Sequence, residues 1–197
     1  MTEPAAVTVL LLGGGQGRRA GGPKALKLHP KTGELLWRFQ RRAILTDAAH
    51  VVTVLHPQAW AAPQPPLAHE AALAADPDAE PFDSLQRGLR ACDPALPVAV
   101  LPVDCPWTGG ALLAALVQAL RAGPRNLLAV RPVVATPAGP RGGHPLLLAP
   151  GALPLLALEP QTARLDHWLR DQGPLVAATE VDDPAVLANF NRDGVAS

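Results

Sequence analysis

The residues that point most directly to chemistry lie in a glycine-rich segment near the start of the chain. Residues 12–24 read LGGGQGRRAGGPK and follow a short apolar run at residues 7–12. A loop with few side chains presents its backbone N–H groups, and such a nest binds phosphate oxygens. Arg18, Arg19 and Lys24 add positive charge to the same segment, which suits a ligand with several phosphate charges. The segment therefore predicts a site for a polyphosphate.

Other glycine motifs and a plain turn are alternatives for this segment. The P-loop ends in Gly-Lys-Ser/Thr, but here Lys24 lies between Pro23 and Ala25, so that pattern fails. The dinucleotide pattern G-x-G-x-x-A is formally present at residues 15–20. It requires a helix at that point and an acid after the second strand, where this chain has His56. A dinucleotide site and a flexible turn with solvated arginines stay open at this stage.

A carboxylate follows a later apolar run. Asp104 comes directly after residues 98–103, which read VAVLPV. An acid at the carboxyl end of a parallel strand lies at the ligand crevice of an α/β sheet. A carboxylate in that place can hold Mg²⁺ against phosphate oxygens. The alternative is a structural turn cap.

The glycine-rich segment resembles the signature L-x-x-G-x-x-x-R-M-G-x-x-K of nucleotidyltransferases with a glycosyltransferase-A-like fold. Gly15, Arg19, Gly21 and Lys24 match this signature without a gap, and Ala20 replaces the usual Met. In that family the loop wraps the phosphates of a nucleoside triphosphate, and the Arg and Lys bind them.

Four later segments resemble further parts of the same family, in the family's order. Residues 83–89, DSLQRGL, resemble a helix start beside the nucleotide, with an ordinary helix cap as the alternative. Residues 101–106, LPVDCP, resemble its strand-ending G-D-x-P motif. Residues 142–148, GGHPLLL, resemble the G-H-P-V-L-F segment of the molybdenum-cofactor cytidylyltransferase and guanylyltransferase (MobA/MocA-like) branch, which lines the acceptor side. Residues 181–191 resemble the closing D/N-x-D/N-T-P-E-D segment, where Asn191 takes the metal-binding place and T-P-E-D is not retained.

The resemblance implies a nucleotidyltransferase that depends on Mg²⁺. It would transfer NMP from CTP or GTP to a phosphorylated acceptor, first of all molybdopterin, and release pyrophosphate. A sugar phosphate or another small phosphate is an alternative acceptor. The residues that the resemblance assigns to the site are, for catalysis, Arg19, Lys24 and Asp104; for the nucleotide, Leu12, Gly13, Gly14, Gly15, Gly17, Arg18 and Ser84; for the acceptor, Gly143 and His144; and for the metal, Asp104 and Asn191.

Two functions of other classes stay open. Loss of the T-P-E-D ending and the replacement at Ala20 are also what a nucleotide-binding module without transfer activity would show. The dinucleotide pattern leaves room for a nicotinamide or flavin oxidoreductase.

The amino-acid composition argues against several classes of protein and of binding partner. The 197 residues contain 17 Lys and Arg against 17 Asp and Glu, which argues against bulk binding to nucleic acid or an anionic membrane. Cys92 and Cys105 are too few for a disulfide scaffold. The start of the chain lacks a basic region, and the apolar stretch 145–158 is broken by Gly and Pro. We therefore expect a soluble cytoplasmic protein.

Apolar periodicity alternates between strand and helix along the chain. Such alternation predicts one three-layer α/β/α domain over residues 1–197, with a mostly parallel twisted sheet that is glycosyltransferase-A-like and Rossmann-related. Residues 57–81, with six prolines, predict a long irregular connection. The predicted strands are 7–12, 51–55, 98–103, 127–130, 133–135 and 175–181; the predicted helices are 34–47, one capped by Asp83 or Ser84 and ending at 91, 111–121 capped by Thr108, 162–172, and 184–189 capped by Asp183.

Overall fold

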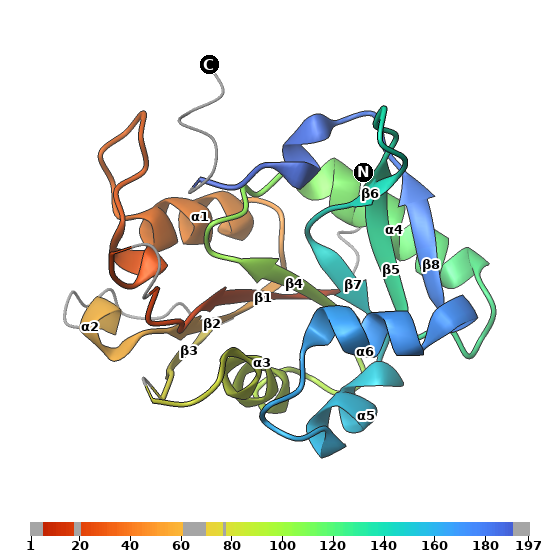
Figure 1. Cartoon of the computed structure of the whole chain (residues 1–197), viewed down its shortest axis with the longest axis horizontal. Coiled ribbons are helices and arrows are strands. Elements are labelled where there is room, and N and C mark those ends of the chain that lie inside the picture. The colour runs from red at the N-terminus through yellow and green to blue at the C-terminus, as the bar shows by residue number, and fades with distance from the viewer. Residues whose placement is uncertain (1–5, 18–20, 61–69, 77, 191–197) are drawn as a thin grey trace.

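The computed structural model describes residues 6–17, 21–60, 70–76 and 78–190. Within them, eight strands form one mixed sheet in the order β3-β2-β1-β4-β7-β5-β6, with β8 paired to β5 (Figure 1). Strands β3, β2, β1 and β4 run parallel, β7 is antiparallel to both β4 and β5, and β8 is parallel to β5. The strands are β1 Thr8–Gly13, β2 His50–Leu55, β3 Glu70–Ala74, β4 Val98–Pro102, β5 Ala129–Val134, β6 Arg141–Gly142, β7 Leu146–Leu148 and β8 Val176–Glu180.

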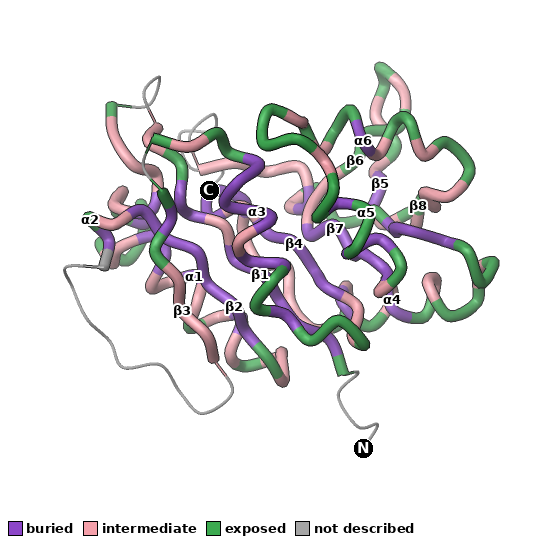
Figure 2. The backbone as a smooth tube through the Cα atoms, turned by 90° about the horizontal axis from the view of Figure 1, so that it is seen from below, coloured by how far each residue is buried: buried purple, intermediate pink, exposed green. Residues whose placement is uncertain are grey.

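Helices cover both faces of this sheet, as the sequence predicts. Successive side chains of a strand point to opposite faces, so Val9 and Leu11 join one core cluster and Leu10 joins the other. The first cluster contains residues of α1 (Leu36–Leu45) and α4 (Gly110–Ala122), and the second contains residues of α3 (Pro81–Arg90), α5 (Ala152–Leu158) and α6 (Leu165–Asp171). Figure 2 shows the central strands buried between these layers.

The connections on either side of β1 make a topological switch point at the carboxyl ends of the parallel strands, which is where α/β sheets bind ligands, and we call this end of the sheet the crevice. The chain leaves β1 through α1 to β2 on one side, and returns through α3 to β4 on the other side. The loops that follow β1 and β4 both lead to helices of one face, α1 and α4. The Val103 N–H donates to the Leu12 carbonyl at 2.8 Å, so the two loops start side by side.

The prediction that residues 57–81 form a long irregular connection is wrong in part. It contains helix α2 (Pro57–Trp60) and the edge strand β3, which pairs with β2 from Val51–Glu70 to Leu55–Ala74. Strand β3 reads EAALA, and alanine and glutamate have low β propensity. Glu70 is fixed there by an ion pair with Arg41 of α1. Residues 61–69 and 77 lie outside the described part.

Several predicted boundaries and caps also need correction. Helix α3 begins at Pro81, so Asp83 and Ser84 lie inside its first turns and do not cap it. Helix α4 begins at Gly110 after Gly109, whose φ of 94° suits only glycine, and Thr108 provides no cap. Strand β5 runs through Pro132 as one strand rather than two. Asp183 does cap the last segment, accepting the Ala185 N–H at 2.9 Å, but this segment is a short 3-10 helix, Pro184–Leu187.

Both cysteines are buried in the core, as are Trp37 and Trp168. Burial raises the pKa of the Cys92 and Cys105 thiols to about 12. We expect a disulfide thiol reagent at pH 8 to label neither thiol in the folded protein, because the nucleophile is the thiolate. Two thiols per chain should react after unfolding in guanidinium. Rapid labelling of one thiol in the native protein would contradict this prediction.

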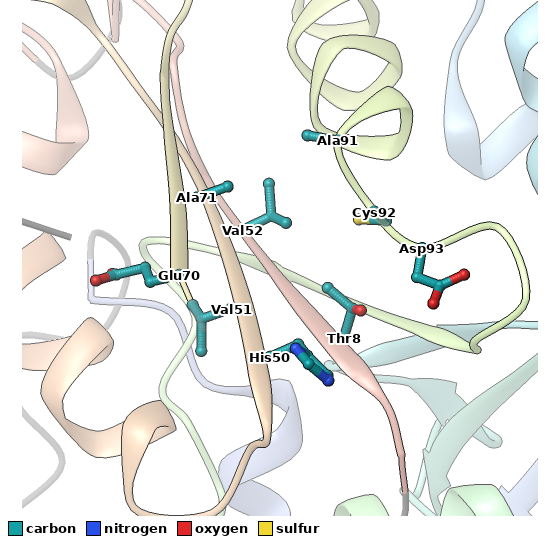
Figure 3. Close-up of a pocket in the computed structure, with 9 residues that line it drawn as sticks. All are labelled: Thr8, His50, Val51, Val52, Glu70, Ala71, Ala91, Cys92 and Asp93. Carbon is teal, nitrogen blue, oxygen red and sulfur yellow. The ribbon is translucent and has the colours of Figure 1, made fainter. Parts of the chain in front are cut away.

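A pocket of about 290 Å³ lies at the amino ends of β1, β2 and β3 (Figure 3). The first residues of three strands, Thr8, His50 and Glu70, line it together with Cys92 and Asp93. Because these residues stand at the amino ends of the strands, the pocket is separate from the loops that follow β1 and β4. No helix in the described residues is both long and apolar enough to cross a bilayer.

Candidate functional site

Asp104 is the centre of a polar cluster at the crevice. It lies two residues after β4 and is 5% exposed. Its Oδ2 accepts a hydrogen bond from Lys24 Nζ at 2.5 Å and another from Asn189 Nδ2 at 2.7 Å. The Asp104 carbonyl also accepts the Phe190 N–H at 2.8 Å. The loop after β1, the loop after β4 and the segment after β8 therefore meet at one carboxylate.

The surroundings of Asp104 keep its carboxyl group ionised. Burial raises the pKa of Asp104, because a charged group loses hydration in the interior. The hydrogen bonds from Lys24 and Asn189 and the positive charge of Lys24 outweigh this effect, and the pKa lies below its usual value. At neutral pH the site holds a buried carboxylate beside an ammonium group.

The glycine-rich loop closes on itself before it reaches Lys24. The Gly22 N–H donates to the Gly17 carbonyl at 3.2 Å. Gly17 has a φ of 59°, and a Cβ on it would lie 1.8 Å from the Gly22 carbonyl oxygen. Only glycine fits at residue 17, since both the backbone conformation and the space exclude a side chain. Gly15, in contrast, is exposed, and a Cβ there would meet nothing within 4 Å.

Gly17→Ala is expected to distort the loop, and Gly15→Ala is its matched control. We expect Gly17→Ala to lower the free energy of unfolding by about 1–3 kcal/mol, the usual cost of backbone strain. Gly15→Ala should leave the midpoint of thermal unfolding unchanged. Thermal unfolding followed by circular dichroism distinguishes the two variants. Equal midpoints for both would show that the closed loop is not a stable feature.

Ser84 packs against this loop from the first turns of α3. A Cβ on Gly14 would lie 2.5 Å from Ser84 Oγ and 2.6 Å from Ala75 Cβ. Gly13 is packed against Leu55 and Ala25. The predicted neighbours Gly14 and Ser84 are therefore in contact, and the close approach needs the absence of a side chain at residue 14.

His144 lies close enough to the same carboxylate for its charge to act on the ring, which is hydrogen-bonded to the Val100 backbone. A Cβ on Gly143 would lie 2.4 Å from the Val186 carbonyl oxygen, and the His144 N–H donates to that oxygen at 2.9 Å. Burial lowers the pKa of His144, and the negative charge of Asp104 offsets this only in part. His144 Nδ1 is buried and makes no hydrogen bond within the described residues. The structure thus brings together Lys24, Asp104 and His144, which the sequence predicts to share a site.

The amide that reaches Asp104 within the described residues is Asn189, which the sequence analysis did not select. Asn189 and Asn191 are the two ends of the short motif NFN. The only feature of the sequence that pointed to Asn189 was therefore its place two residues before the predicted Asn191. Arg18, Arg19 and Asn191, to which the sequence analysis assigned phosphate and metal contacts, lie outside the described residues. Among those described, no three His, Cys, Asp or Glu side chains gather as a metal site.

The dinucleotide alternative does not match the geometry of the loop. Residues 14–17 are not helical, and the first helical segment after β1 in the described part is the 3-10 turn Lys24–Leu26. A dinucleotide site needs a full helix whose N-terminus faces the pyrophosphate.

Comparison with known proteins identifies the family of the chain. The model of the MobA-like NTP transferase domain matches residues 9–177, from β1 into β8. The chain belongs to the MobA-like NTP transferase domain family. This MobA-like domain is accordingly a nucleotidyltransferase domain, and its ligands are a nucleoside triphosphate and a phosphorylated acceptor. A search of curated proteins by sequence finds no match.

Solved structures share the fold of this MobA-like domain. The homologue of Mycobacterium tuberculosis Rv0371c from Mycobacterium sp. strain JC1 matches with a TM-score of 0.72 and 22% identity, over 94% of this chain and 90% of that one. The 2-C-methyl-D-erythritol 4-phosphate cytidylyltransferase from Thermus thermophilus matches with a TM-score of 0.64 and 21% identity, over 95% and 92%. Rv0371c from M. tuberculosis H37Rv in complex with manganese matches with a TM-score of 0.70 and 16% identity, over 96% and 94%. These likenesses confirm the predicted α/β class; the sheet was predicted to be mostly parallel, and it is mixed and parallel at its centre.

Proposed function

We propose that this chain transfers NMP from CTP or GTP to a phosphorylated acceptor, molybdopterin being the first candidate, with release of pyrophosphate. The observation that carries the proposal is the contact of Lys24 and Asn189 with the buried Asp104 carboxylate at the crevice. The loop beside it, 12–24, supplies backbone N–H groups and cations suited to a triphosphate.

The proposed reaction is an in-line displacement at the α-phosphorus. An oxygen of the acceptor phosphate forms a bond to the α-phosphorus, and the bond from that phosphorus to the bridging oxygen breaks. Pyrophosphate leaves with the electron pair of the broken bond. Because the acceptor phosphate is already anionic near neutral pH, the site needs no strong general base. Catalysis then depends on positioning and on charge neutralisation.

Each part of the cluster has a role in this scheme. Lys24, with Arg19, would offset the charge that grows on the leaving pyrophosphate. Ser84 and the backbone around residues 12–14 would hold the base and sugar. The loop at Gly143 and His144 would meet the acceptor phosphate.

The donor groups at the site suit a divalent metal only if the substrate and water supply most of its ligands. With a single carboxylate at the centre of the described cluster, an ion would take most of its ligands from phosphate oxygens and water. Mg²⁺ is commonly held in this manner, by one or two carboxylates and the substrate's phosphates. Asp104 would hold the ion, with Asn191 as a second oxygen ligand. When bound, Mg²⁺ would neutralise charge on the α-phosphate. The manganese complex of Rv0371c supports a divalent ion.

The acceptor has a second candidate. The neighbour from T. thermophilus is named as a cytidylyltransferase of 2-C-methyl-D-erythritol 4-phosphate, a small sugar-type phosphate. The segment GGHPLLL at 142–148 favours molybdopterin, because it resembles the molybdenum-cofactor branch.

Pyrophosphate release tests the proposal directly. The protein is incubated with Mg²⁺, each of the four NTPs in turn, and either molybdopterin or 2-C-methyl-D-erythritol 4-phosphate. Release with one NTP and one acceptor would support the proposal and assign both substrates. NTP binding without release with any acceptor would favour a nucleotide-binding module. Absence of NTP binding would overturn the proposal.

A further inference from the structure

The loop that carries Asp104 is held from behind by a fully buried amide. Gln40 lies in α1 and is 0% exposed. Its Nε2 donates to the Val103 carbonyl at 3.3 Å and also to the Cys105 carbonyl. Its Oε1 accepts the Trp107 N–H at 3.1 Å. One side chain therefore binds the backbone on both sides of Asp104.

The partners of Gln40 leave its amide group only one orientation. Two carbonyl oxygens require a donor, and one N–H requires an acceptor. A rotated amide would place its own oxygen against both carbonyls and its NH₂ group against the Trp107 N–H. Because Gln40 lies among apolar core residues such as Leu36 and Ile44, leaving these groups unpaired would be costly. The loop and the amide thus fix each other.

The same loop has a second tie to the α1–β2 connection. Trp107 Nε1 donates to Asp47 Oδ2 at 2.7 Å. A Cβ on Gly110 would also lie 3.2 Å from the Asp47 carboxyl group. Neither the Gln40 hydrogen bonds nor the Trp107–Asp47 hydrogen bond involves the Asp104 side chain. Its Oδ2 therefore accepts from Lys24 and Asn189 on the crevice side.

We infer that Gln40 is a positioning residue, which holds the peptide groups on either side of Asp104 and so fixes the carboxylate relative to Lys24. This inference rests on the proposed function, since it gives Gln40 a part in the transfer reaction. Turnover is sensitive to such placement, because a displacement of about 1 Å of a reacting group can cost about a hundredfold in rate.

The test compares Gln40→Met with Ile44→Ala. Met keeps the length of the side chain but removes its donors and its acceptor, whereas Ile44→Ala opens a cavity in the same core without touching the loop's hydrogen bonds. For both variants we would measure thermal unfolding, kcat and KM for the NTP, and amide hydrogen exchange of the peptide that spans residues 101–109. Wild-type protein is measured alongside.

We expect Gln40→Met to lower kcat by about tenfold to a hundredfold with little change in KM, and to speed exchange in residues 101–109 selectively. Ile44→Ala should lower the unfolding midpoint while it keeps kcat within about threefold, as a change remote from the reacting groups would. Equal kcat losses in the two variants, or exchange that rises uniformly in Gln40→Met, would overturn the inference and leave Gln40 a stability residue.

Two further measurements keep the inference separable from folding and from the proposed function. If Gln40→Met does not fold, amide exchange of the wild-type protein still tests the inference. The Trp107 N–H, which Gln40 Oε1 accepts, should be protected from exchange in the native protein, and rapid exchange of this amide would overturn the inference. Absence of pyrophosphate release from the wild type would defeat the proposed function, and exchange in residues 101–109 would still decide whether Gln40 holds the loop.

Discussion

Asp104→Asn is expected to lower kcat by about 10²–10³-fold, the usual loss when one preorganised charge contact is removed. The amide keeps the size of the side chain but removes the negative charge that Lys24 and Asn189 contact. It also removes the only carboxylate of the described cluster able to hold a divalent ion. The measurement is initial pyrophosphate release at saturating NTP and acceptor.

Asp166→Asn is the matched control for this prediction. Asp166 forms an exposed ion pair with Arg164 on α6, away from the crevice, and exposed pairs contribute little to stability. The kcat of Asp166→Asn should equal that of the wild type. An Asp104→Asn variant that turns over within a few-fold of wild type would remove Asp104 from the reaction.

Lys24→Met is expected to cost about as much, 10²–10³-fold in kcat/KM. Met keeps the long apolar stem and loses the ammonium group that we propose faces the leaving pyrophosphate. Lys24→Arg should restore only part of the activity, because a planar guanidinium does not reproduce a point charge that approaches Oδ2 at 2.5 Å. A Lys27→Met control changes a neighbouring lysine outside the Asp104 contact. Equal activity of the two Met variants would contradict the role of Lys24.

Lys24→Met is also expected to change the pKa of Asp104 in the nucleotide-free protein. Lys24 and Asn189 lower the pKa of Asp104, whereas burial raises it. Removing the Lys24 ammonium leaves burial less opposed, so the pKa of Asp104 should rise. In the wild type the low pKa contributes stability that is present above the unfolded pKa and lost as the pH falls through the folded one. Lys24→Met should therefore be less stable than the wild type at neutral pH and lose less stability on acidification. An unchanged carboxyl titration by NMR would contradict this.

The position of Asp104 follows from sequence because hydrophobic runs locate strand ends. The run at 98–103 and the glycines after residue 12 end two strands that are parallel neighbours, and the carboxyl ends of such strands share one edge. The loop and the carboxylate were therefore predictable as one site. Their contact through Lys24 was not, because the path of the loop depends on the closure between Gly17 and Gly22.

Two other features lie beyond reasoning from pattern. The spacing of Gln40 from Leu36 and Ile44 places it on the buried face of α1, but this spacing does not show which groups its amide binds. Its partners lie 63 to 67 residues away along the chain. Strand β3 was missed for a related reason, since a run of alanines becomes a strand only when β2 offers it an edge. In both places tertiary contacts override local preference.

The carboxylate that joins Lys24 to Asn189 also sets an order of events during synthesis. Lys24 lies 80 residues before Asp104, and Asn189 lies 85 residues after it. A ribosome that has delivered residues up to β4 has supplied every strand of the parallel half of the sheet, yet Asp104 still lacks its amide partner. The contacts of Asp104 are complete only once the segment after β8 has emerged, so a nascent or truncated chain that lacks this segment holds the glycine-rich loop without the finished centre beside it.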